Sequence, residues 1–360
     1  MTTLFDPTSL GDITVKNRIF MAPLTRNRAN PDGTPNTSAE IYYSQRASAG
    51  LIISEASQIN PLGKGYINTP GIYADEHIAA WKGITNAVHS AGGKIVLQLW
   101  HVGRISHDTV LPAGEKPVAP SAIQADAQTF TVDGPTATSA PREMTVAEIE
   151  STVADFASAA RAAIDAGFDG VEIHGANGYL LNQFLSTNAN KRTDAYGGSP
   201  ENRAKIVLDI VDAVTKEVGK GRVGIRLSPT GTFNDVKDDE AEATYRYLFA
   251  EIDQRDLAFL HVVETFPGVE TTTEDMALTK SLRDGFKGNY IANGGYDKDS
   301  AAEAVENGSV AVSFGRMFIA NPDLPERFKL GAELNELDGN TLYGGGSEGY
   351  TDYKALQSAA

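Results

Sequence analysis

The stretch Gly170-Val171-Glu172-Ile173-His174-Gly175-Ala176-Asn177-Gly178-Tyr179-Leu180 runs from the pattern of a buried β-strand directly into hydrogen-bonding side chains. An imidazole, a carboxamide and a phenol follow one another within six residues. Two of these groups can donate to a substrate oxygen, and a phenol with the ordinary pKa of about 10 can protonate a strongly basic carbanion. A strand end, a turn and the first residue of a core helix would use the same residue types, so both interpretations remain open here.

The rest of the chain repeats this layout of an apolar strand followed by a polar or glycine-rich loop. Continuous apolar runs alternate with amphipathic patterns, which is typical of parallel strands covered by helices. Eight such units predict one α/β domain over residues 1–360, a (β/α)8 TIM barrel. A doubly wound open sheet is the alternative, but no strand is followed by a G-x-G-x-x-G or G-x-x-x-x-G-K-S/T loop. The expected strands are residues 19–22, 51–54, 94–99, 170–174, 223–227, 259–263, 290–292 and 310–314.

Capping patterns place three of the intervening helices. Thr145 and Glu148 form a capping box, and Gly167 marks the end of that helix. A second helix opens with Pro200 at its first position, and a third begins near Asp75. The apolar residues that follow each of these starts recur with helical spacing, so each helix has one face to bury.

Three segments fall outside the repeat. Residues 2–17 predict a hairpin that closes the barrel floor. Residues 103–142, after the third strand, are too long for a bare loop and predict a lid-like insertion with some strand content over the barrel mouth. Residues 343–350 are rich in glycine and flanked by tyrosines, so a flexible tail and a packed segment both remain open.

Composition excludes several classes of protein. The formal net charge of −16 disfavours nucleic acid and anionic membranes as partners. The absence of cysteine excludes disulfides, thiolate nucleophiles and cysteine-ligated metal sites, and no metal is expected. No signal-peptide pattern and no apolar run of about 18 residues are present, which predicts a cytoplasmic protein. We expect a small-molecule substrate and a monomer or homodimer.

The residues at the carboxyl ends of the expected strands predict a ligand. Gly294-Gly295 and Gly315 expose backbone N–H groups where barrels commonly bind phosphate, and Arg316 adds a cation there. Gln98 and Arg226 suit a heterocycle such as an isoalloxazine ring. A salt-bridged core arginine, a satisfied polar core group and a tight glycine turn are the alternatives for these positions taken singly.

Five motifs occur in order along the chain. They are Ala-Pro-Leu-Thr-Arg at 22–26, Gln-Leu-Trp-His-x-Gly-Arg at 98–104, His-Gly-Ala-Asn-Gly-Tyr-Leu at 174–180, Ile-Arg-Leu-Ser-Pro at 225–229 and Phe-Gly-Arg-x-Phe-Ile-Ala-Asn-Pro-Asp-Leu at 314–324. Together they resemble the Old Yellow Enzyme family of FMN-dependent, NAD(P)H-consuming ene-reductases, and the resemblance runs from Leu4 to about Tyr353, nearly the whole chain.

This resemblance implies a TIM barrel with FMN at its mouth, reduced by NAD(P)H and reoxidised in a ping-pong cycle by an α,β-unsaturated carbonyl or nitro compound. His174 and Asn177 would bind the substrate oxygen, and Tyr179 would protonate the α-carbon after hydride transfer from flavin N5 to the β-carbon. Tyr66, Trp100 and Tyr343 would line the substrate channel. The implied cofactor-binding residues are Pro23, Thr25, Ala56, Gln98, His174, Arg226, Asn293, Gly294, Gly295, Gly315 and Arg316.

The chain departs from parts of the family in ways that bear on substrate. Some members carry a second histidine where this chain has Asn177, and relatives with iron–sulfur clusters need cysteines that are absent here. Residues 266–276, a region of substrate contact in the family, show no clear correspondence. Nitrate esters or nitroaromatics as native substrates are one alternative. A cofactor-free barrel aldolase or isomerase and a non-catalytic flavin or phosphate binder are the others, although no Schiff-base lysine or carboxylate base is evident at a strand end.

Overall fold

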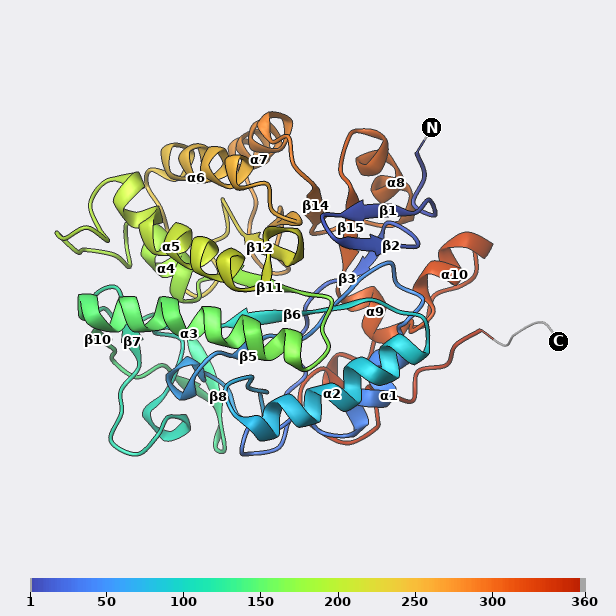
Figure 1. Cartoon of the computed structure of the whole chain (residues 1–360), viewed down its shortest axis with the longest axis horizontal. Coiled ribbons are helices and arrows are strands. Elements are labelled where there is room, and N and C mark those ends of the chain that lie inside the picture. The colour runs from blue at the N-terminus through green and yellow to red at the C-terminus, as the bar shows by residue number, and fades with distance from the viewer. Residues whose placement is uncertain (1, 357–360) are drawn as a thin grey trace.

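The computed structural model describes residues 2–356 and contains a closed barrel of eight parallel strands (Figure 1). The predicted (β/α)8 barrel is therefore confirmed. The ring closes because β15 pairs with β3 and β6 pairs with β11. In order around the barrel the strands are β3 (Ile19–Met21), β4 (Ile52–Ile53), β6 (Ile95–Trp100), β11 (Gly170–Gly175), β12 (Val223–Leu227), β13 (Phe259–Val263), β14 (Tyr290–Asn293) and β15 (Ala311–Phe314).

The predicted strand ends were wrong by one or two residues at several places. Leu51 and Ser54 lie outside the short strand β4, whereas Trp100 and Asn293 belong to strands predicted to stop before them. Apolar pattern alone does not define where ladder hydrogen bonds begin and end, because flanking residues can be equally buried.

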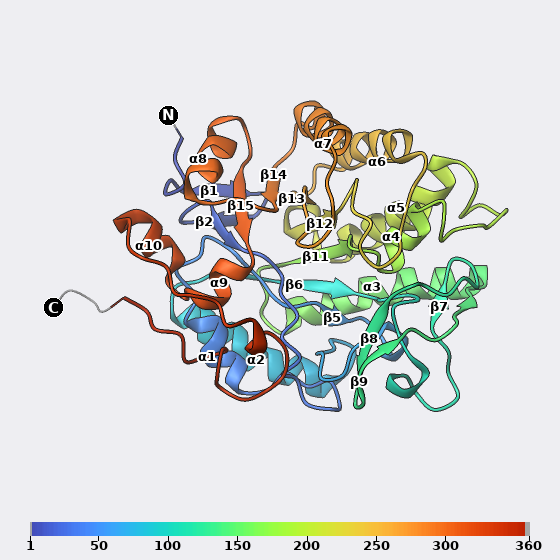
Figure 2. The ribbon, with the colours of Figure 1, turned by 180° about the vertical axis from the view of Figure 1, so that it is seen from behind.

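Helices surround the barrel, as Figures 1 and 2 show from opposite sides. The predicted capping box is present at Thr145, Ser199 caps the helix that opens with Pro200, and another helix starts at Asp75. The α-helices are α1 (Ser38–Ser44), α2 (Asp75–Ser90), α3 (Val146–Asp165), α4 (Leu180–Leu185), α5 (Pro200–Val218), α6 (Ala241–Arg255), α7 (Thr273–Gly285), α8 (Lys298–Glu306), α9 (Arg316–Ala320) and α10 (Leu324–Leu330). Short 3-10 turns are η1 (Pro61–Gly63), η2 (Asp108–Val110), η3 (Lys220–Arg222) and η4 (Gly339–Thr341).

The barrel floor is apolar and is closed by the predicted N-terminal hairpin. Strands β1 (Thr8–Leu10) and β2 (Ile13–Val15) pair antiparallel. Leu10, Ile13 and Val15 of the hairpin belong to one buried cluster with floor residues that include Phe20 and Phe259. Burial of this apolar surface stabilises the barrel end that lies away from the loops.

The insertion after β6 contains the strands that its composition suggested. Strands β8 (Gln128–Thr131) and β9 (Gly134–Ala137) form an antiparallel hairpin, and β10 (Arg142–Glu143) pairs with β7 (Val118–Ala119). A further short strand, β5 (Ser57–Gln58), pairs with β6. Phe130 of the hairpin lies 6.3 Å from Tyr66 and 6.1 Å from Tyr343 between ring centroids. The hairpin therefore stands beside two residues predicted to line the substrate channel. Its action as a lid within a single domain stays a prediction.

The C-terminal segment is packed at one end and exposed at the other. Tyr350 is 1% exposed and stacks on Tyr42 with ring centroids 4.1 Å apart, whereas Tyr343 is 59% exposed. Arg26 and Arg28 hold this segment by donating to the backbone carbonyl oxygens of residues 341, 342, 346, 348 and 349.

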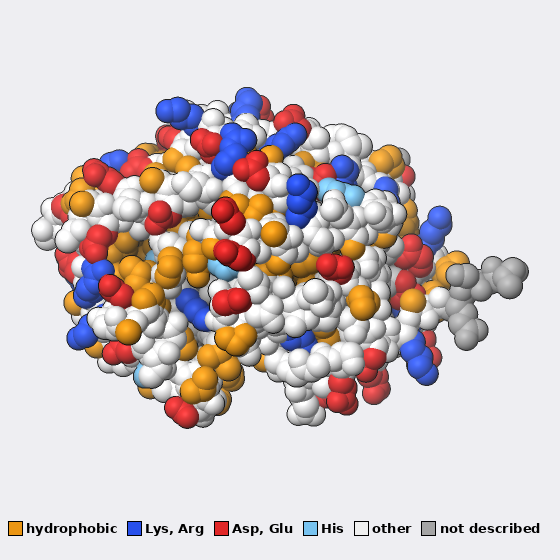
Figure 3. All heavy atoms as spheres, turned by 60° about the horizontal axis from the view of Figure 1, so that its bottom comes forward, with side chains coloured by type: hydrophobic (Ala, Val, Ile, Leu, Met, Phe, Trp, Pro, Cys, Tyr) orange, Lys and Arg blue, Asp and Glu red, His pale blue; other side chains and the backbone are white. Residues whose placement is uncertain are grey.

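Charged side chains of both signs cover the face shown in Figure 3, where lysine and arginine lie among aspartate and glutamate. Hydrophobic side chains gather toward the lower left of the same face. None of the helices in residues 2–356 combines the length and the apolar composition that a membrane-spanning helix requires.

Candidate active site

Four predicted site residues gather at the carboxyl ends of β6 and β11. The ring of Tyr179 lies edge-on to both Trp100 and His174, with centroid distances of 4.9 and 5.1 Å. Tyr66 stacks on Trp100 at 5.7 Å. Three aromatic rings and an imidazole, which are separated in sequence, thus form one wall at the barrel mouth.

His174 is arranged to donate a hydrogen bond from Nε2. Its side chain is nearly buried, and its Nδ1 accepts from the backbone N–H of Ala176 at 3.3 Å. Burial, with Arg226 and then His261 nearby, lowers the pKa of His174 well below its usual value. The ring is therefore neutral, and because Nδ1 is the acceptor, the hydrogen is on Nε2.

Asn177 occupies a backbone conformation that few residue types tolerate. Its φ of 57° lies in the left-handed region, which asparagine enters more readily than most residues. Its backbone N–H donates to Ser228 Oγ at 2.9 Å, and its carbonyl oxygen accepts from Asn234 Nδ2 at 3.0 Å. The main chain is held from both sides, so the position of the side-chain amide is restricted.

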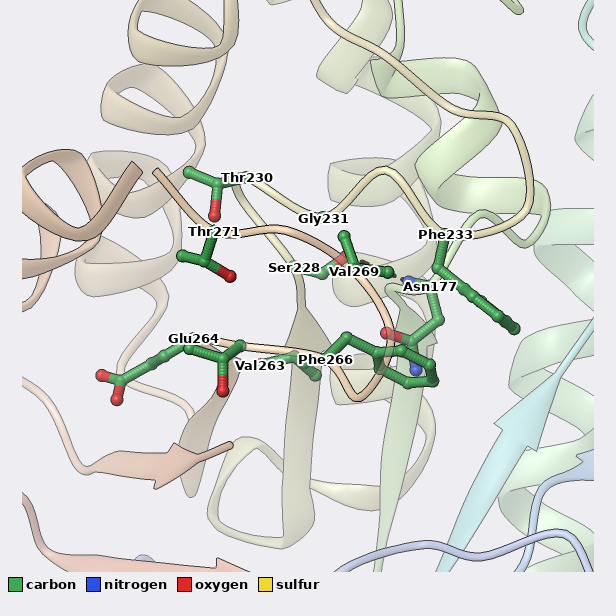
Figure 4. Close-up of a pocket in the computed structure, with 11 residues that line it drawn as sticks. Asn177, Ser228, Thr230, Gly231, Phe233, Val263, Glu264, Phe266, Val269 and Thr271 are labelled. Atoms are coloured by element: carbon green, nitrogen blue, oxygen red, sulfur yellow. Dashed lines mark hydrogen bonds between the residues drawn. The ribbon is translucent and has the colours of Figure 1, made fainter. Parts of the chain in front are cut away.

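The Asn177 side chain faces a small pocket between the loops after β12 and β13 (Figure 4). Phe233 and Phe266 line this pocket, and their rings lie 4.5 Å apart. Glu264 also lines it but points away from Asn177 in this view. Phe266 therefore lies near a predicted substrate-binding residue, whereas Met276 is on α7 with its side chain exposed. Within residues 266–276, for which the sequence offered no assignment, the structure thus places the first residue at the pocket and the last on an exposed helix surface.

Tyr179 is protonated over the whole physiological pH range. Burial raises its pKa to about 12, and hydrogen bonds from neighbouring groups only partly oppose this. Its hydroxyl lies 3.1 Å from the hydroxyl of Tyr66. A phenol in this state can release a proton only to a strongly basic acceptor.

Arg226 is buried without a full set of partners. Its Nη2 donates to Asn293 Oδ1 at 2.7 Å, while its Nε has no partner among the described residues. It makes no ion pair within the described chain, so the alternative of a salt-bridged core arginine is wrong. Burial lowers the pKa of Arg226 to about 10, which still leaves it charged at neutral pH. A buried guanidinium with free N–H groups indicates an acceptor-rich ligand.

Glycines after β14 and β15 leave backbone donors free. The N–H groups of Gly294, Gly295, Gly315 and Arg316 donate to no acceptor within residues 2–356. A Cβ on Gly294 would lie 2.5 Å from the carbonyl oxygen of Thr265, and its φ is 121°, so only glycine fits there. The exposed Arg316 side chain stands beside these amides. This combination suits a phosphate group.

The remaining predicted cofactor residues lie at the same barrel end. Pro23 and Thr25 follow β3 and are half-buried, and Ala56 follows β4 and is buried. Gln98 on β6 is buried and donates from Nε2 to Glu172 Oε1 at 2.8 Å. The free donors of Arg226 and the glycine-rich phosphate cradle fit FMN, a flat acceptor-rich ring that carries one phosphate. Tyr343 is exposed at the rim of this end, with its ring 6.1 Å from that of Phe130, which in turn lies 6.3 Å from Tyr66.

Sequence reasoning missed several residues of the site. Phe130 reaches it from strand β8, and Phe233 and Asn234 reach it from the loop after β12; the positions of both segments depend on tertiary structure. Glu172 and His261 could have been found from the sequence, because each is a titratable residue within a run of mostly apolar strand residues, and such a residue indicates a buried polar group. Glu172 also has the same parity as His174 on β11, so both point to the barrel interior.

Comparison with known proteins agrees with this geometry. The family model for NADH:flavin oxidoreductase / NADH oxidase matches residues 3–335. The chain is 42% identical to 12-oxophytodienoate reductase 2 of Arabidopsis thaliana, over 99% of this chain and 96% of that protein. A structure of morphinone reductase superposes with a TM-score of 0.95 at 50% identity, covering 99% of this chain and 97% of that one. The Old Yellow Enzyme homologue from Zymomonas mobilis has a TM-score of 0.95 at 42% identity, covering 99% and 100%.

The chain therefore belongs to the NADH:flavin oxidoreductase / NADH oxidase family, which includes the Old Yellow Enzymes. The resemblance read from its motifs is confirmed. It is an oxidoreductase with FMN as its cofactor, and a cofactor-free aldolase or isomerase is excluded.

Proposed function

We propose that the protein reduces the activated C=C bond of α,β-unsaturated carbonyl or nitro compounds at the expense of NAD(P)H. The observation that carries this proposal is the arrangement of a protonated Tyr179 edge-on to a neutral, N–H-donating His174. A structure of morphinone reductase with tetrahydroNAD, 50% identical to this chain, supports a nicotinamide as the reductant. Bound FMN, once reduced by that nicotinamide, would supply the hydride that the β-carbon of the substrate receives.

His174 and Asn177 bind the substrate oxygen in this proposal. Both offer N–H donors, and burial of His174 strengthens its hydrogen bond by excluding water. Negative charge grows on this oxygen as the β-carbon is attacked, so donors fixed beforehand stabilise the transition state more than the ground state.

Tyr179 then protonates the α-carbon. Its raised pKa keeps the proton in place until a carbanion of high basicity forms beside it. The hydroxyl of Tyr66, at 3.1 Å, orients the phenol and is positioned to share the resulting charge. Trp100 restricts the ring of Tyr179 from the other side.

The remaining cofactor contacts follow from charge and hydrogen-bonding capacity. Arg226 would stabilise negative charge on one side of the flavin ring, and Thr25, Gln98 and the backbone of Ala56 would bind its carbonyl and imide groups. Asn293, through its hydrogen bond to Arg226, orients that guanidinium. Pro23 and His174 would contact the ring, and Gly294, Gly295, Gly315 and Arg316 would bind the phosphate.

Anaerobic spectroscopy of the purified protein tests the proposal. A yellow protein should bleach on addition of NADPH or NADH and regain its colour on addition of 2-cyclohexenone. Failure of the enone to reoxidise the bleached protein would contradict the proposed substrate class. Steady-state rates across enones, maleimides, nitroalkenes, nitroaromatics and nitrate esters then decide between C=C reduction and reduction of nitrogen–oxygen groups as the preferred reaction.

A further inference from the structure

A row of four buried polar side chains crosses the barrel interior next to the site. Gln98 Nε2 donates to Glu172 Oε1 at 2.8 Å, Glu172 Oε2 lies 2.7 Å from His261 Nδ1, and His261 Nε2 lies 2.7 Å from Ser313 Oγ. These residues come from β6, β11, β13 and β15. Only Gln98 has a place in the proposed function.

Glu172 determines the direction of every hydrogen bond in this row. Gln98 presents its NH2 group to Glu172 Oε1, and His261, with its hydrogen on Nδ1, donates to the other carboxyl oxygen. Burial lowers the pKa of His261, which leaves the ring neutral and Nε2 free to accept from Ser313. The amide of Gln98 therefore has one possible orientation, with nitrogen toward Glu172.

The same constraint defines what Gln98 offers to a ligand. One of its two N–H groups is committed to Glu172, and within residues 2–356 its carbonyl oxygen accepts no hydrogen bond. One donor and one acceptor remain side by side. An edge on which a C=O and an N–H group are adjacent, such as the pyrimidine edge of a flavin, is the complement of this pair.

Burial of the Glu172 carboxyl group is unfavourable for the free energy of folding. Glu172 and His261 are both 0% exposed, and removing a carboxylate from water costs several kcal/mol unless partners compensate. No arginine or lysine lies within salt-bridge distance of Glu172 in the described chain, although the charge of Arg226 acts on it from farther away. Its direct partners are Gln98 and a histidine whose pKa burial lowers. Hydrophobic packing would fill this space at lower cost, which indicates a role beyond stability.

We propose that Glu172 is a positioning residue that fixes the side-chain amide of Gln98 in the orientation that recognises the pyrimidine edge of FMN. This inference rests on the proposed contact of Gln98 with the flavin. Glu172 itself need not touch the cofactor, because it acts through the Gln98 amide.

The test is the FMN dissociation constant, measured by titrating apoprotein with FMN and following flavin fluorescence. Glu172→Leu removes both acceptors at similar volume and should raise the constant about tenfold, as expected for the loss of about one oriented hydrogen bond. Glu172→Gln should stay within about threefold of the wild type. Its carbonyl oxygen can still accept from Gln98, while His261 changes tautomer and the Ser313 hydroxyl rotates.

A double-mutant cycle separates positioning from stability. If Glu172 acts through Gln98, Glu172→Leu should have no further effect on FMN affinity in a Gln98→Ala background. Ser313→Ala is the matched control, because it shortens the far end of the row without touching Gln98. It should lower the unfolding temperature of the apoprotein while leaving the FMN dissociation constant within about twofold.

Each outcome has a separate meaning. Additive effects of Glu172→Leu and Gln98→Ala, or equal losses for Glu172→Leu and Glu172→Gln, would overturn the inference. Unchanged FMN affinity in Gln98→Ala alone would instead refute the placement of Gln98 against the flavin. If Glu172→Leu does not fold, Glu172→Asp replaces it: the charge stays but the acceptor is withdrawn by one carbon, and wild-type affinity in that variant would equally overturn the inference.

Discussion

The two ends of the barrel differ in the side chains that they bury. At the floor, the N-terminal hairpin covers a cluster of apolar side chains from the lower halves of the strands. At the mouth, buried Arg226 Nε and Trp100 Nε1 have no hydrogen-bond partner within residues 2–356. Unpaired buried atoms also occur near the floor, at Arg18, Ser48 and Ser309, but only the mouth combines them with the free backbone amides of the glycines after β14 and β15, and this combination marks where a ligand completes the structure.

This difference assigns different consequences to substitutions at the two ends. Changes at the floor should alter the free energy of unfolding with little effect on chemistry. Changes at the mouth should alter rates and cofactor affinity. The barrel folds without hydrogen-bond partners for those groups, because a bound ligand provides the partners.

The largest expected effect is on the chemistry at the mouth. Tyr179→Phe should slow reoxidation of the reduced enzyme by 2-cyclohexenone by about 10²–10⁴, the usual contribution of a general acid. Reduction by NADPH should be almost unchanged, because that half-reaction needs no proton from the phenol. Stopped-flow absorbance separates the two half-reactions, and an unaltered enone rate would remove Tyr179 from its proposed role. A strongly activated nitroalkene serves as a control, since its stable nitronate can take its proton from water.

At the floor, Phe259→Ala should lower the free energy of unfolding by about 3–5 kcal/mol. The ring is buried in the floor cluster and lies against Gly224, where an added Cβ would lie 2.1 Å from the nearest atom of the ring. Apoprotein unfolding in urea measures the loss, and Phe259→Leu should cost less because it leaves a smaller cavity. The folded fraction should keep its enone rate; a loss of rate as large as that of Tyr179→Phe would break the distinction between floor and mouth.

A smaller effect concerns a buried carboxyl near the mouth, Glu55, and its dependence on pH. Burial raises the pKa of Glu55 from 4.5 to about 7. The folded state therefore binds this proton more tightly than the unfolded state, and the stability it contributes is complete below pH 4.5 and is lost as pH rises through 7. Glu55→Gln should remove this loss, so its unfolding free energy relative to wild type should rise between pH 5 and pH 8 by up to about 3 kcal/mol.

Comparing the two proteins at each pH is necessary because other buried groups titrate in the opposite sense. Burial lowers the pKa of His101 to about 3 and also lowers those of His174 and His261. Their unfolded forms take up protons below about pH 6.5, so they reduce stability in acid in both proteins alike. A difference between Glu55→Gln and wild type that does not change with pH would contradict the assignment to Glu55.

The smallest expected effect is at the exposed rim. Tyr343→Ala should change the free energy of unfolding by no more than about 0.5 kcal/mol, because its side chain is 59% exposed. Its ring lies 6.1 Å from Phe130, so KM for bulky enones should rise while the rate at saturation is kept. Phe130→Ala should show the same pattern if the hairpin and the C-terminal segment form one rim, and independent changes in KM would separate them.

Much of the fold was readable because it depends on local pattern. The capping box at Thr145 and the proline that opens α5 define helix starts through contacts within a few residues. Apolar runs predicted all eight barrel strands. Strand ends were less certain, as the two-residue β4 shows. The positions of His174, Asn177 and Tyr179 were predictable because they follow one strand and so share one end of the barrel, although their roles stay predictions.

The sequence by itself determined that eight strands alternate with helices and that polar residues and glycines stand at the strand ends, because periodicity and turn chemistry act over short distances. Only the tertiary structure decided that Phe130 reaches Tyr66, that Phe266 lies beside Asn177, and that Glu172 joins Gln98 to His261. Each of these contacts links elements far apart in the chain. They depend on the closure of the barrel and the paths of its loops, which no local pattern encodes.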